Sequence, residues 1–181
     1  MGIILPSDFT IDRYGLHARL VREDDAAFIL GLRIDPKRSR FIHSTDNDVG
    51  KQIQWIKNYK NREKIGSDYY FIYSFEGKPI AVNRLYDITY DCATCGSWLC
   101  KDALLPEQSV STLILLRDIL FEILNLDYDR FDVRKANKQV LKLHKMFGAR
   151  ITGETDIDFF LELDKNTYKI NKENILRILN I

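Results

Sequence analysis

Cysteine has the most distinctive spacing among the reactive residue types of this chain. Three cysteines, Cys92, Cys95 and Cys100, lie in one short segment, and the first two have the C-x-x-C spacing of redox pairs and zinc knuckles. No second C-x-x-C pair and no His-x-x-x-His pair follows in the sequence, so a tetrahedral zinc site lacks ligands. An odd number of clustered cysteines is also a poor disulfide framework and suits a reducing compartment. We therefore interpret the cysteines as structural or incidental and predict no metal site.

A second group with chemical potential is the polar stretch that contains Arg38, Arg40 and His43. Two arginines can hold a phosphate or a carboxylate through paired hydrogen bonds, and solvated surface charge is the alternative interpretation. The whole chain has 27 Lys+Arg against 26 Asp+Glu, a formal net charge of +1. Because this balance gives no large positive field, we predict no nucleic-acid binding and no attachment to a membrane surface through charge.

Length and composition indicate one domain. The 181 residues are 45% apolar and 29% charged, which is enough to bury a substantial core. The longest apolar runs, such as residues 113–116, are far shorter than the roughly 20 residues that span a bilayer. Residues 1–6 carry no basic flank and too short an apolar stretch for a secretory signal. We therefore predict a cytoplasmic protein with no membrane partner.

Hydrophobic periodicity and turn residues predict interleaved strands and helices. The expected strands are residues 16–22, 69–75, 79–88, 94–100, 130–134 and 157–163, and the expected helices are residues 23–33, 48–64, 107–124, 137–147 and 170–179. There is no repeat and no Pro/Gly/Ser-rich linker. We expect a single domain over residues 1–181 of the α/β (α+β) class, with a central mixed, largely antiparallel sheet flanked by helices.

This order of elements is that of the GNAT N-acetyltransferases, and several segments resemble the family. Residues 137–153 resemble the family segment in which an Asn opens a helix that ends in a Leu-Gly-Phe-like turn. Residues 55–56, 69–72, 77–80 and 85–88 have counterparts in the branch of ribosomal-protein N-terminal acetylases and bacterial amino-sugar acetyltransferases. The resemblance covers roughly residues 16–163. It implies a GNAT-like domain that moves acetyl from acetyl-CoA to a primary amine by direct attack.

One segment departs from the family pattern. The phosphate loop of the family reads Arg/Gln-x-x-Gly-x-Gly/Ala before the long helix, whereas the corresponding residues 106–112 contain no glycine. Small residues and the positive end of a helix dipole could still bind a pyrophosphate, and the alternative is that these residues only begin a buried helix. By resemblance, the expected cofactor-binding residues are Trp98, Leu99 and Cys100 on the central strand, then Gln108, Ser109, Val110, Ser111 and Thr112, and Asn137.

The resemblance also implies catalytic residues. His144 stands seven residues after Asn137, where the family commonly has a Tyr that protonates the departing thiolate, and a His with its ordinary pKa near 6.5 can do this. Asp87 is our candidate for the base that neutralises the amine. Arg84 and Tyr90 border it on the same segment and, with Arg38, Arg40 and His43, form the expected substrate-binding set. The alternatives are a helix cap for Asn137, a partly exposed helical residue for His144 and a solvated aspartate for Asp87.

The resemblance, together with the basic loop and His144, implies a small primary amine as acceptor, such as an amino sugar, either free or nucleotide-linked. The alternatives are a protein N-terminus or lysine as acceptor, or a non-catalytic GNAT-like domain that binds a ligand, as the missing glycines suggest. The sequence leaves the oligomeric state open between monomer and homodimer.

Overall fold

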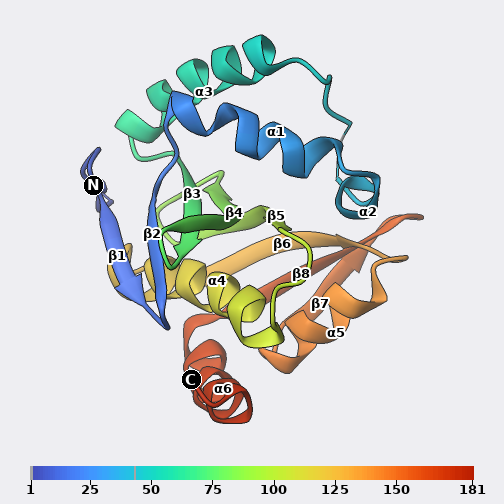
Figure 1. Ribbon diagram of the computed structural model, residues 1–181. Coiled ribbons are helices and arrows are strands. Elements are labelled where there is room, and N and C mark those ends of the chain that lie inside the picture. Colours follow the sequence, from blue (N-terminus) through green and yellow to red (C-terminus); the bar gives the residue numbers. More distant parts are fainter. Residues whose placement is uncertain (1, 43) are drawn as a thin grey trace.

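The computed structural model describes residues 2–42 and 44–181, and within them an eight-stranded sheet forms the centre of the molecule (Figure 1). The strand order is β1-β2-β3-β4-β5-β6-β8-β7, and every neighbouring pair is antiparallel except β5 and β6, which are parallel. The strands are β1 (Thr10–Arg13), β2 (Leu16–Leu20), β3 (Asp68–Phe75), β4 (Lys78–Tyr86), β5 (Cys92–Cys100), β6 (Tyr128–Arg134), β7 (Arg150–Glu154) and β8 (Asp158–Asp164).

Helices cover both faces of this sheet (Figure 1). They are α1 (Ala26–Ile34), α2 (Pro36–Ser39), α3 (Val49–Lys64), α4 (Pro106–Asp118), α5 (Lys138–Met146) and α6 (Lys165–Leu179), with a 3-10 turn at Glu23–Asp25 and a π-helical turn at Ile119–Ile123. The central strand β3 is buried on both sides, because Tyr70 and Ile72 belong to the core under α1 and α3 while Tyr69, Phe71 and Tyr73 belong to the core under α4. This explains its unbroken aromatic and aliphatic sequence.

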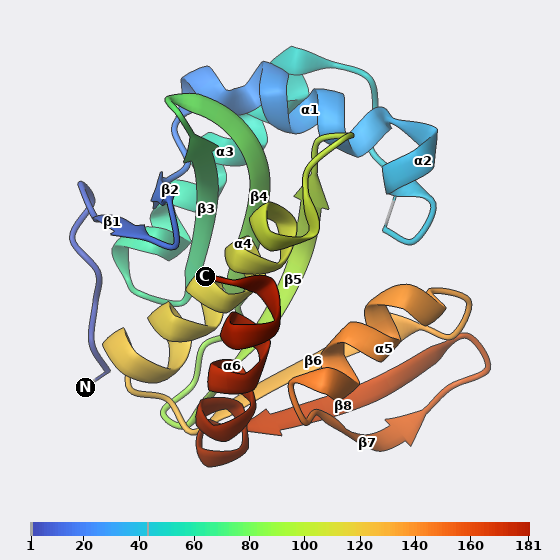
Figure 2. The ribbon, with the colours of Figure 1, turned by 60° about the horizontal axis from the view of Figure 1, so that its bottom comes forward.

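The parallel pair β5–β6 is joined at only two positions, Cys92↔Tyr128 and Ala93↔Asp129. Beyond them the two strands diverge (Figure 2). The N–H of Cys95, the next donor along β5, bonds to the side-chain oxygen of Asp129 at 3.2 Å instead of to a strand backbone. Asp129 therefore ends the ladder and begins the wedge between the strands.

The structure confirms the fold class expected from the sequence, with two strands and several boundaries added. The sequence prediction missed β1 and β7, which are the two edge strands, of four and five residues, with no buried side chain. The expected helix at residues 107–124 changes to π-helical geometry after Asp118. The final helix begins at Lys165 rather than residue 170, because the carboxylate of Asp164 accepts a hydrogen bond from the N–H of Thr167.

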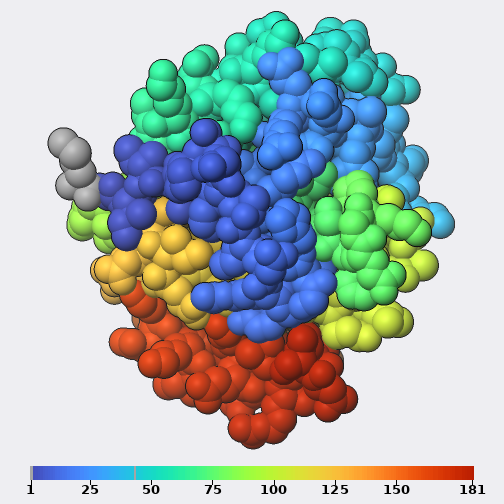
Figure 3. All heavy atoms as spheres, turned by 60° about the vertical axis from the view of Figure 1, so that its left-hand side comes forward, coloured from blue at the N-terminus to red at the C-terminus, as the bar shows by residue number. Residues whose placement is uncertain are grey.

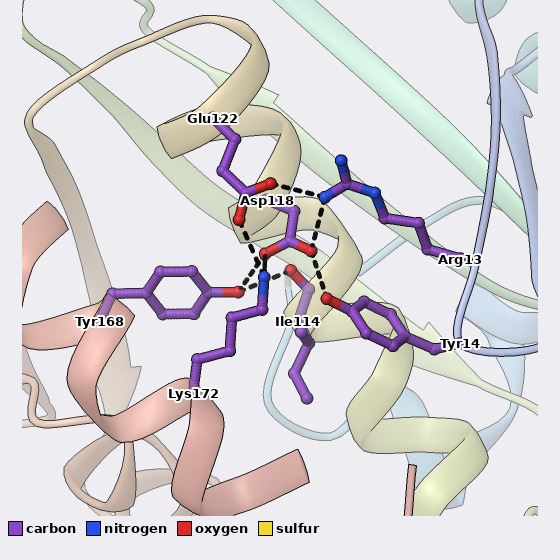
Figure 4. Close-up of polar contacts among 7 residues, drawn as sticks. All are labelled: Arg13, Tyr14, Ile114, Asp118, Glu122, Tyr168 and Lys172. Carbon is purple, nitrogen blue, oxygen red and sulfur yellow. Dashed lines mark hydrogen bonds and ion pairs between the residues drawn. The ribbon is translucent and has the colours of Figure 1, made fainter.

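A buried carboxylate ties the first hairpin to the last helix (Figure 4). Asp118 is fully buried on α4 and accepts hydrogen bonds, at 2.6–3.0 Å, from four side chains: Arg13, Tyr14, Tyr168 and Lys172. Burial acts to lower the pKa of Lys172, but hydrogen bonds to Asp118 and Glu122 outweigh burial and raise this pKa. Figure 3 shows the N-terminal segment, in blue, between α3 and the red C-terminal segment. The hydrogen bonds of Asp118 join the N-terminal and C-terminal segments to α4. We call the side chains of Arg13, Tyr14, Asp118, Glu122, Tyr168 and Lys172 the Asp118 network.

Candidate active site

Two cavities meet at one residue of β5. The first, which we call the α3 cavity, has a volume of 520 Å³ and includes residues of α3, β3 and β4 in its lining. The second, which we call the wedge cavity, has a volume of 140 Å³ and lies between the diverging strands β5 and β6, with α5 beside it. Ser97 lines both cavities. Groups that enter from the two sides would therefore meet beside Ser97.

A β-bulge lies at this meeting point. The register between β4 and β5 shifts between Val82 and Arg84, so Ser97 and Trp98 together face the single residue Asn83. Ser97 has a φ of 54°, in the left-handed region, as expected where a strand carries one extra residue. Because a bulge leaves backbone groups outside the ladder, this point of β5 offers hydrogen-bonding groups to a ligand.

The α3 cavity carries excess positive charge. Its lining includes Arg33, Lys51 and Arg84 but, among the described residues, only the carboxylate of Asp46. Arg33 Nε donates to the hydroxyl of Thr45 at 2.7 Å, and Lys51 Nζ pairs with Asp46 at 2.6 Å on the exposed rim. The hydrogen bond from Lys51 lowers the pKa of Asp46. These charges favour an anionic ligand.

Arg84 is held rigidly in this cavity. Its Nε donates to Asp68 at 2.7 Å, and its guanidinium lies 4.7 Å from the ring centre of Tyr86 and 5.2 Å from that of Trp55. Tyr86 in turn lies directly against Gly96, where an added Cβ would be 2.8 Å from the tyrosine ring. Burial is the main cause that raises the pKa of Tyr86 to about 12. The glycine thus lets an aromatic ring close one side of the α3 cavity.

Tyr70 forms another part of the α3 cavity. Its side chain is buried and its hydroxyl has no hydrogen-bond partner among the described residues. Burial raises the pKa of Tyr70 to about 12, although the positive charges of Arg33 and Arg84 oppose the rise. The hydroxyl is therefore neutral at physiological pH and free to bond a polar ligand.

A buried charged cluster closes the inner end of the wedge cavity. Arg117 is fully buried on α4 and donates through Nε to Asp129 at 2.9 Å. Its Nη2 lies 2.9 Å from Nδ1 of His144, which lines the cavity. Burial, and then the charge of Arg117, lowers the pKa of His144 well below 6.5. Because a guanidinium only donates, the neutral imidazole accepts at Nδ1 and carries its hydrogen on Nε2.

Several sequence-predicted residues do come together here. Trp98, Asn137 and His144 all line the wedge cavity, and Arg84 lines the α3 cavity. Arg38, expected beside the acceptor, lies instead against the wedge cavity, where its Nε donates to the carbonyl oxygen of Cys100 at 2.6 Å. His144 also differs from the sequence-based expectation of an ordinary pKa near 6.5, because it is buried and its pKa is lowered well below that value.

The expected phosphate site at the start of α4 has most of its polar groups engaged within the helix. Gln108 accepts a hydrogen bond from the N–H of Leu105 at 3.0 Å and so caps its own helix. The N–H of Ser109 bonds to the Leu105 carbonyl at 3.1 Å, and its hydroxyl bonds to the Pro106 carbonyl at 3.1 Å. These groups therefore differ from a glycine loop, whose N–H groups point outward.

The next turn of α4 faces the core. Ser111 and Thr112 are buried and Val110 is half-buried against the core. Thr112 accepts a hydrogen bond from the indole of Trp98 at 2.9 Å, whereas the hydroxyl of Ser111 has no partner among the described residues. On the neighbouring strand, Leu99 is a core residue and burial raises the pKa of the Cys100 thiol to about 12.

Other predicted residues lie apart from both cavities. Asp87 is exposed and lines neither cavity but a third hollow of 510 Å³ beside β6 and β8, which shares Tyr86 with the α3 cavity and Asp132 with the wedge cavity. Tyr90 is 92% exposed, and Arg40 is exposed with its guanidinium over Phe41. The prediction for His43 lies outside the described residues. The set expected for substrate binding is thus not brought to one place.

Sequence reasoning missed five residues that the structure brings to the site or directly behind it. They are Arg33, Tyr70, Asn83, Ser97 and Arg117. Two of them carried a usable signal, because Asn83 interrupts an apolar strand and Arg117 interrupts the apolar run of the long helix. Nothing local marks the bulge at Ser97, which depends on the register with β4.

Comparison with known proteins decides the family. No family model and no curated protein matches the sequence. A solved structure described as apo FdhC, a nucleotide-linked sugar GNAT, is 33% identical over 95% of this chain and 99% of its own, with a TM-score of 0.85. The chain belongs to the GNAT family.

More distant GNAT structures share the fold. Ribosomal-protein-S5-alanine acetyltransferase from Vibrio fischeri is 14% identical, covers 89% of this chain and 99% of its own, and has a TM-score of 0.74. Spermidine N-acetyltransferase from Vibrio cholerae, solved with CoA and spermine, is 17% identical, covers 87% of this chain and 99% of its own, and has a TM-score of 0.73. The family expected from the sequence is confirmed. Among the described residues of this GNAT chain, no helix is long and apolar enough to cross a membrane.

Proposed function

We propose that this GNAT chain transfers an acetyl group from acetyl-CoA to the primary amine of a nucleotide-linked amino sugar. The observation that carries the proposal is the meeting of the two cavities at the β5 bulge, where a thioester from one side and an amine from the other would come together. The 33% identical relative is itself described as a nucleotide-linked sugar GNAT. The excess positive charge of the α3 cavity suits the phosphates of such an acceptor.

The residues present fit acetyl-CoA along the wedge cavity. The diverging strands leave one edge of β5 without a strand partner beyond Ala93, so its backbone can bond an extended pantetheine arm as a further strand would. Asn137 and the backbone of Trp98, Leu99 and Cys100 are the proposed contacts, and Gln108, Ser109, Val110, Ser111 and Thr112 are those proposed for the phosphates. When bound, acetyl-CoA supplies an activated acyl group.

The state of His144 changes its proposed catalytic role. A neutral imidazole with a lowered pKa holds no extra proton to release at pH 7. Its Nε2–H can instead donate a hydrogen bond to the departing sulfur and stabilise the charge that develops there. We therefore assign His144 to hydrogen bonding of the leaving group, with no net proton transfer from the ring.

The amine also needs a group that takes its proton. Asp87, the sequence candidate, does not line the α3 cavity but the third hollow, which shares Tyr86 with it. Asp46 lines the α3 cavity, but its pKa is lowered by Lys51, which makes it a weaker base. Asp132 lines the same third hollow but, unlike Asp87, also lines the wedge cavity, and after burial it is the next cause of the raised pKa of Tyr86. We therefore favour Asp132, reached directly or through water, and expect Asp132→Asn to lower turnover more than Asp87→Asn.

One observation favours a second candidate function. The polar groups at the start of α4 are largely bonded within the helix, so the site offers fewer free donors for a pyrophosphate than a glycine loop does. A non-catalytic GNAT domain that binds an anionic sugar nucleotide alone would show this feature. Acetyl-CoA binding separates the two functions.

The deciding experiment is a calorimetric titration with acetyl-CoA followed by an acceptor screen. Free thiol release is measured with nucleotide-linked amino sugars, glucosamine, spermidine and a peptide with an N-terminal alanine. Micromolar acetyl-CoA binding with turnover only of the nucleotide-linked sugars supports the proposal. Turnover of the peptide alone supports a protein acetyltransferase, and absent acetyl-CoA binding supports the binding domain.

The acceptor side has its own matched pair of variants. Arg33→Gln removes a cation from the α3 cavity, and Arg177→Gln removes an exposed arginine from α6. We expect Arg33→Gln to raise KM for the sugar nucleotide about tenfold or more, because charge-assisted hydrogen bonds contribute roughly 1.5–3 kcal/mol. Arg177→Gln leaves KM unchanged. Equal behaviour of the two variants would argue against phosphate binding in the α3 cavity.

A further inference from the structure

Asn83 is the polar residue that faces the bulge of β5. It is fully buried on β4 and lines the wedge cavity close to Ser97, where the two cavities meet. Its Oδ1 accepts a hydrogen bond from the N–H of Arg84 at 3.0 Å. Because a backbone N–H can only donate, this contact fixes which end of the amide is oxygen. The other end, Nδ2, is buried and has no partner among the described residues.

The hydrogen bond with Arg84 uses only Oδ1, so nothing among the described residues accounts for the Nδ2 donor of Asn83. Its apolar neighbours on β4 are Val82 and Leu85. Val82 packs into the core on one face of the sheet, and Leu85 packs into the core on the other face. A buried N–H donor without a partner destabilises a fold. Such a donor is retained where a ligand completes its hydrogen bonding. The ligand that reaches this point through the wedge cavity would be the thioester end of acetyl-CoA.

We propose that the side-chain amide of Asn83 donates a hydrogen bond from Nδ2 to the carbonyl oxygen of the acetyl thioester. The inference rests on the proposed function and adds a catalytic residue to it. As the amine nitrogen forms its bond to the acetyl carbon, the carbonyl electron pair moves onto the oxygen that Nδ2 and the bulge backbone face. The C–S bond then breaks, the carbonyl re-forms, and the proton lost by the nitrogen ends on the departing thiolate after passing through the base.

A donor aimed at this oxygen discriminates between acetyl-CoA and CoA, because CoA has no carbonyl there. In Asn83→Leu, a substitution of similar size, we expect acetyl-CoA affinity to fall about three- to tenfold, the range of one neutral hydrogen bond. CoA affinity should stay within about twofold of wild type, since the rest of the molecule keeps its contacts. Turnover should fall more, by about a hundredfold, because the oxygen gains charge in the transition state. Calorimetry with each ligand and a thiol-release assay measure the three effects.

Two further variants make the test decisive. Asn83→Asp keeps the shape and the Oδ1 acceptor but has no Nδ2 donor, so at pH 8 it should show the same selective loss even where Asn83→Leu folds poorly. Tyr73→Phe is the control, since Tyr73 on β3 also has a buried hydroxyl without a partner but does not line the wedge cavity. This variant should bind acetyl-CoA and CoA as wild type does.

The outcomes separate this proposal from the proposed function. Equal loss of acetyl-CoA and CoA affinity in both Asn83 variants would overturn it, because the side chain would then hold the arm of the cofactor or the fold itself. Wild-type affinity and turnover in both variants would also overturn it while leaving the proposed function intact. Failure of the wild-type protein to bind either ligand would overturn the proposed function and, with it, this inference.

Discussion

The Asp118 network and the meeting point of the two cavities are both buried polar regions, but the hydrogen-bonding capacity of their atoms is satisfied to different extents. In the network, both oxygens of Asp118 accept hydrogen bonds, and the nearby cations pair with Asp118 and Glu122 (Figure 4). At the cavities, Tyr70 and Asn83 each keep a buried donor without a partner, and Arg117 behind His144 keeps a third. A completed network stabilises a fold, whereas an incomplete one leaves groups available to a ligand.

The two regions also differ in what fixes them along the chain. The network joins the β1–β2 hairpin, α4 and α6 through side chains, with Arg13 105 residues and Lys172 54 residues from Asp118 in sequence. The cavity region depends on the backbone, through the bulge at Ser97 and the early end of the β5–β6 ladder. Substitutions in the first region should therefore act on stability, and those in the second on binding and catalysis.

The largest effect should come from Asp118→Ala. This change leaves Lys172, which is mostly buried, without its closest anion and the Tyr14 hydroxyl without its acceptor, whereas the Tyr168 hydroxyl keeps the Ile114 carbonyl. Removing one partner from a buried ion pair destabilises a protein by about 3–5 kcal/mol. Denaturant unfolding measures it, with Glu122→Ala as the control at the half-exposed end of the network, where about 1 kcal/mol or less is expected. A loss below 1 kcal/mol for Asp118→Ala would remove the contrast between the two regions.

A smaller effect, seen only in acid, should come from His144. Its folded-state pKa is lowered by burial and by Arg117, while the unfolded chain has the ordinary value near 6.5. The stability that depends on a neutral His144 is fully present above pH 6.5. As the pH falls from 6.5 toward the folded-state pKa, the unfolded chain takes up a proton that the folded chain does not, so stability falls by up to about 1.4 kcal/mol per pH unit.

The matched variants for this measurement are His144→Gln and His17→Gln, the second being an exposed histidine on β2. Between pH 6.5 and 5.5, His144→Gln should lose less stability than wild type by roughly 1 kcal/mol. His17→Gln should follow the wild-type curve. Parallel curves for wild type and His144→Gln would show that the imidazole is not held neutral.

The smallest effect should come from Ser111→Ala. The hydroxyl of Ser111 is buried in α4 without a partner, and alanine also has the higher helix propensity. We expect the variant to unfold at equal or slightly higher stability, by about 0.5–1 kcal/mol. A thermal melt measures the change, and calorimetry with CoA shows whether the hydroxyl contributes to the cofactor site. A clear loss of stability would show that the hydroxyl has an interaction within the fold.

The core and the element order followed from the sequence because apolar periodicity encodes them directly. The buried run at residues 69–73 and the apolar helix at residues 111–121 each contain the pattern that their packing requires. The short edge strands β1 and β7 bury no side chain, so they carry little of this pattern. Tertiary hydrogen bonding forms them, and no local rule predicts it.

The candidate site was only partly predictable for a related reason. Asn137 and His144 could be located by resemblance, since they lie at fixed positions in one helix and its start. The protonation state of His144 depends on Arg117, 27 residues away, and on burial that the sequence does not reveal. Likewise, Asp87 follows β4 directly in sequence, but its backbone is in the left-handed region, with a φ of 51°, and it lines a different hollow from Arg84.

The two-pair junction between β5 and β6 gives the sheet a mechanical property. Only Cys92↔Tyr128 and Ala93↔Asp129 couple the strands, so the sheet consists of two leaves, β1–β5 and β6–β8–β7, that share one short seam. Arg117 and Asp129 form a fully buried ion pair at this junction. Asp129 accepts a hydrogen bond from the N–H of Cys95 in the first leaf, and Arg117 bonds to His144 of α5. The ion pair therefore braces the point at which the two leaves separate, at the inner end of the slot open to a cofactor.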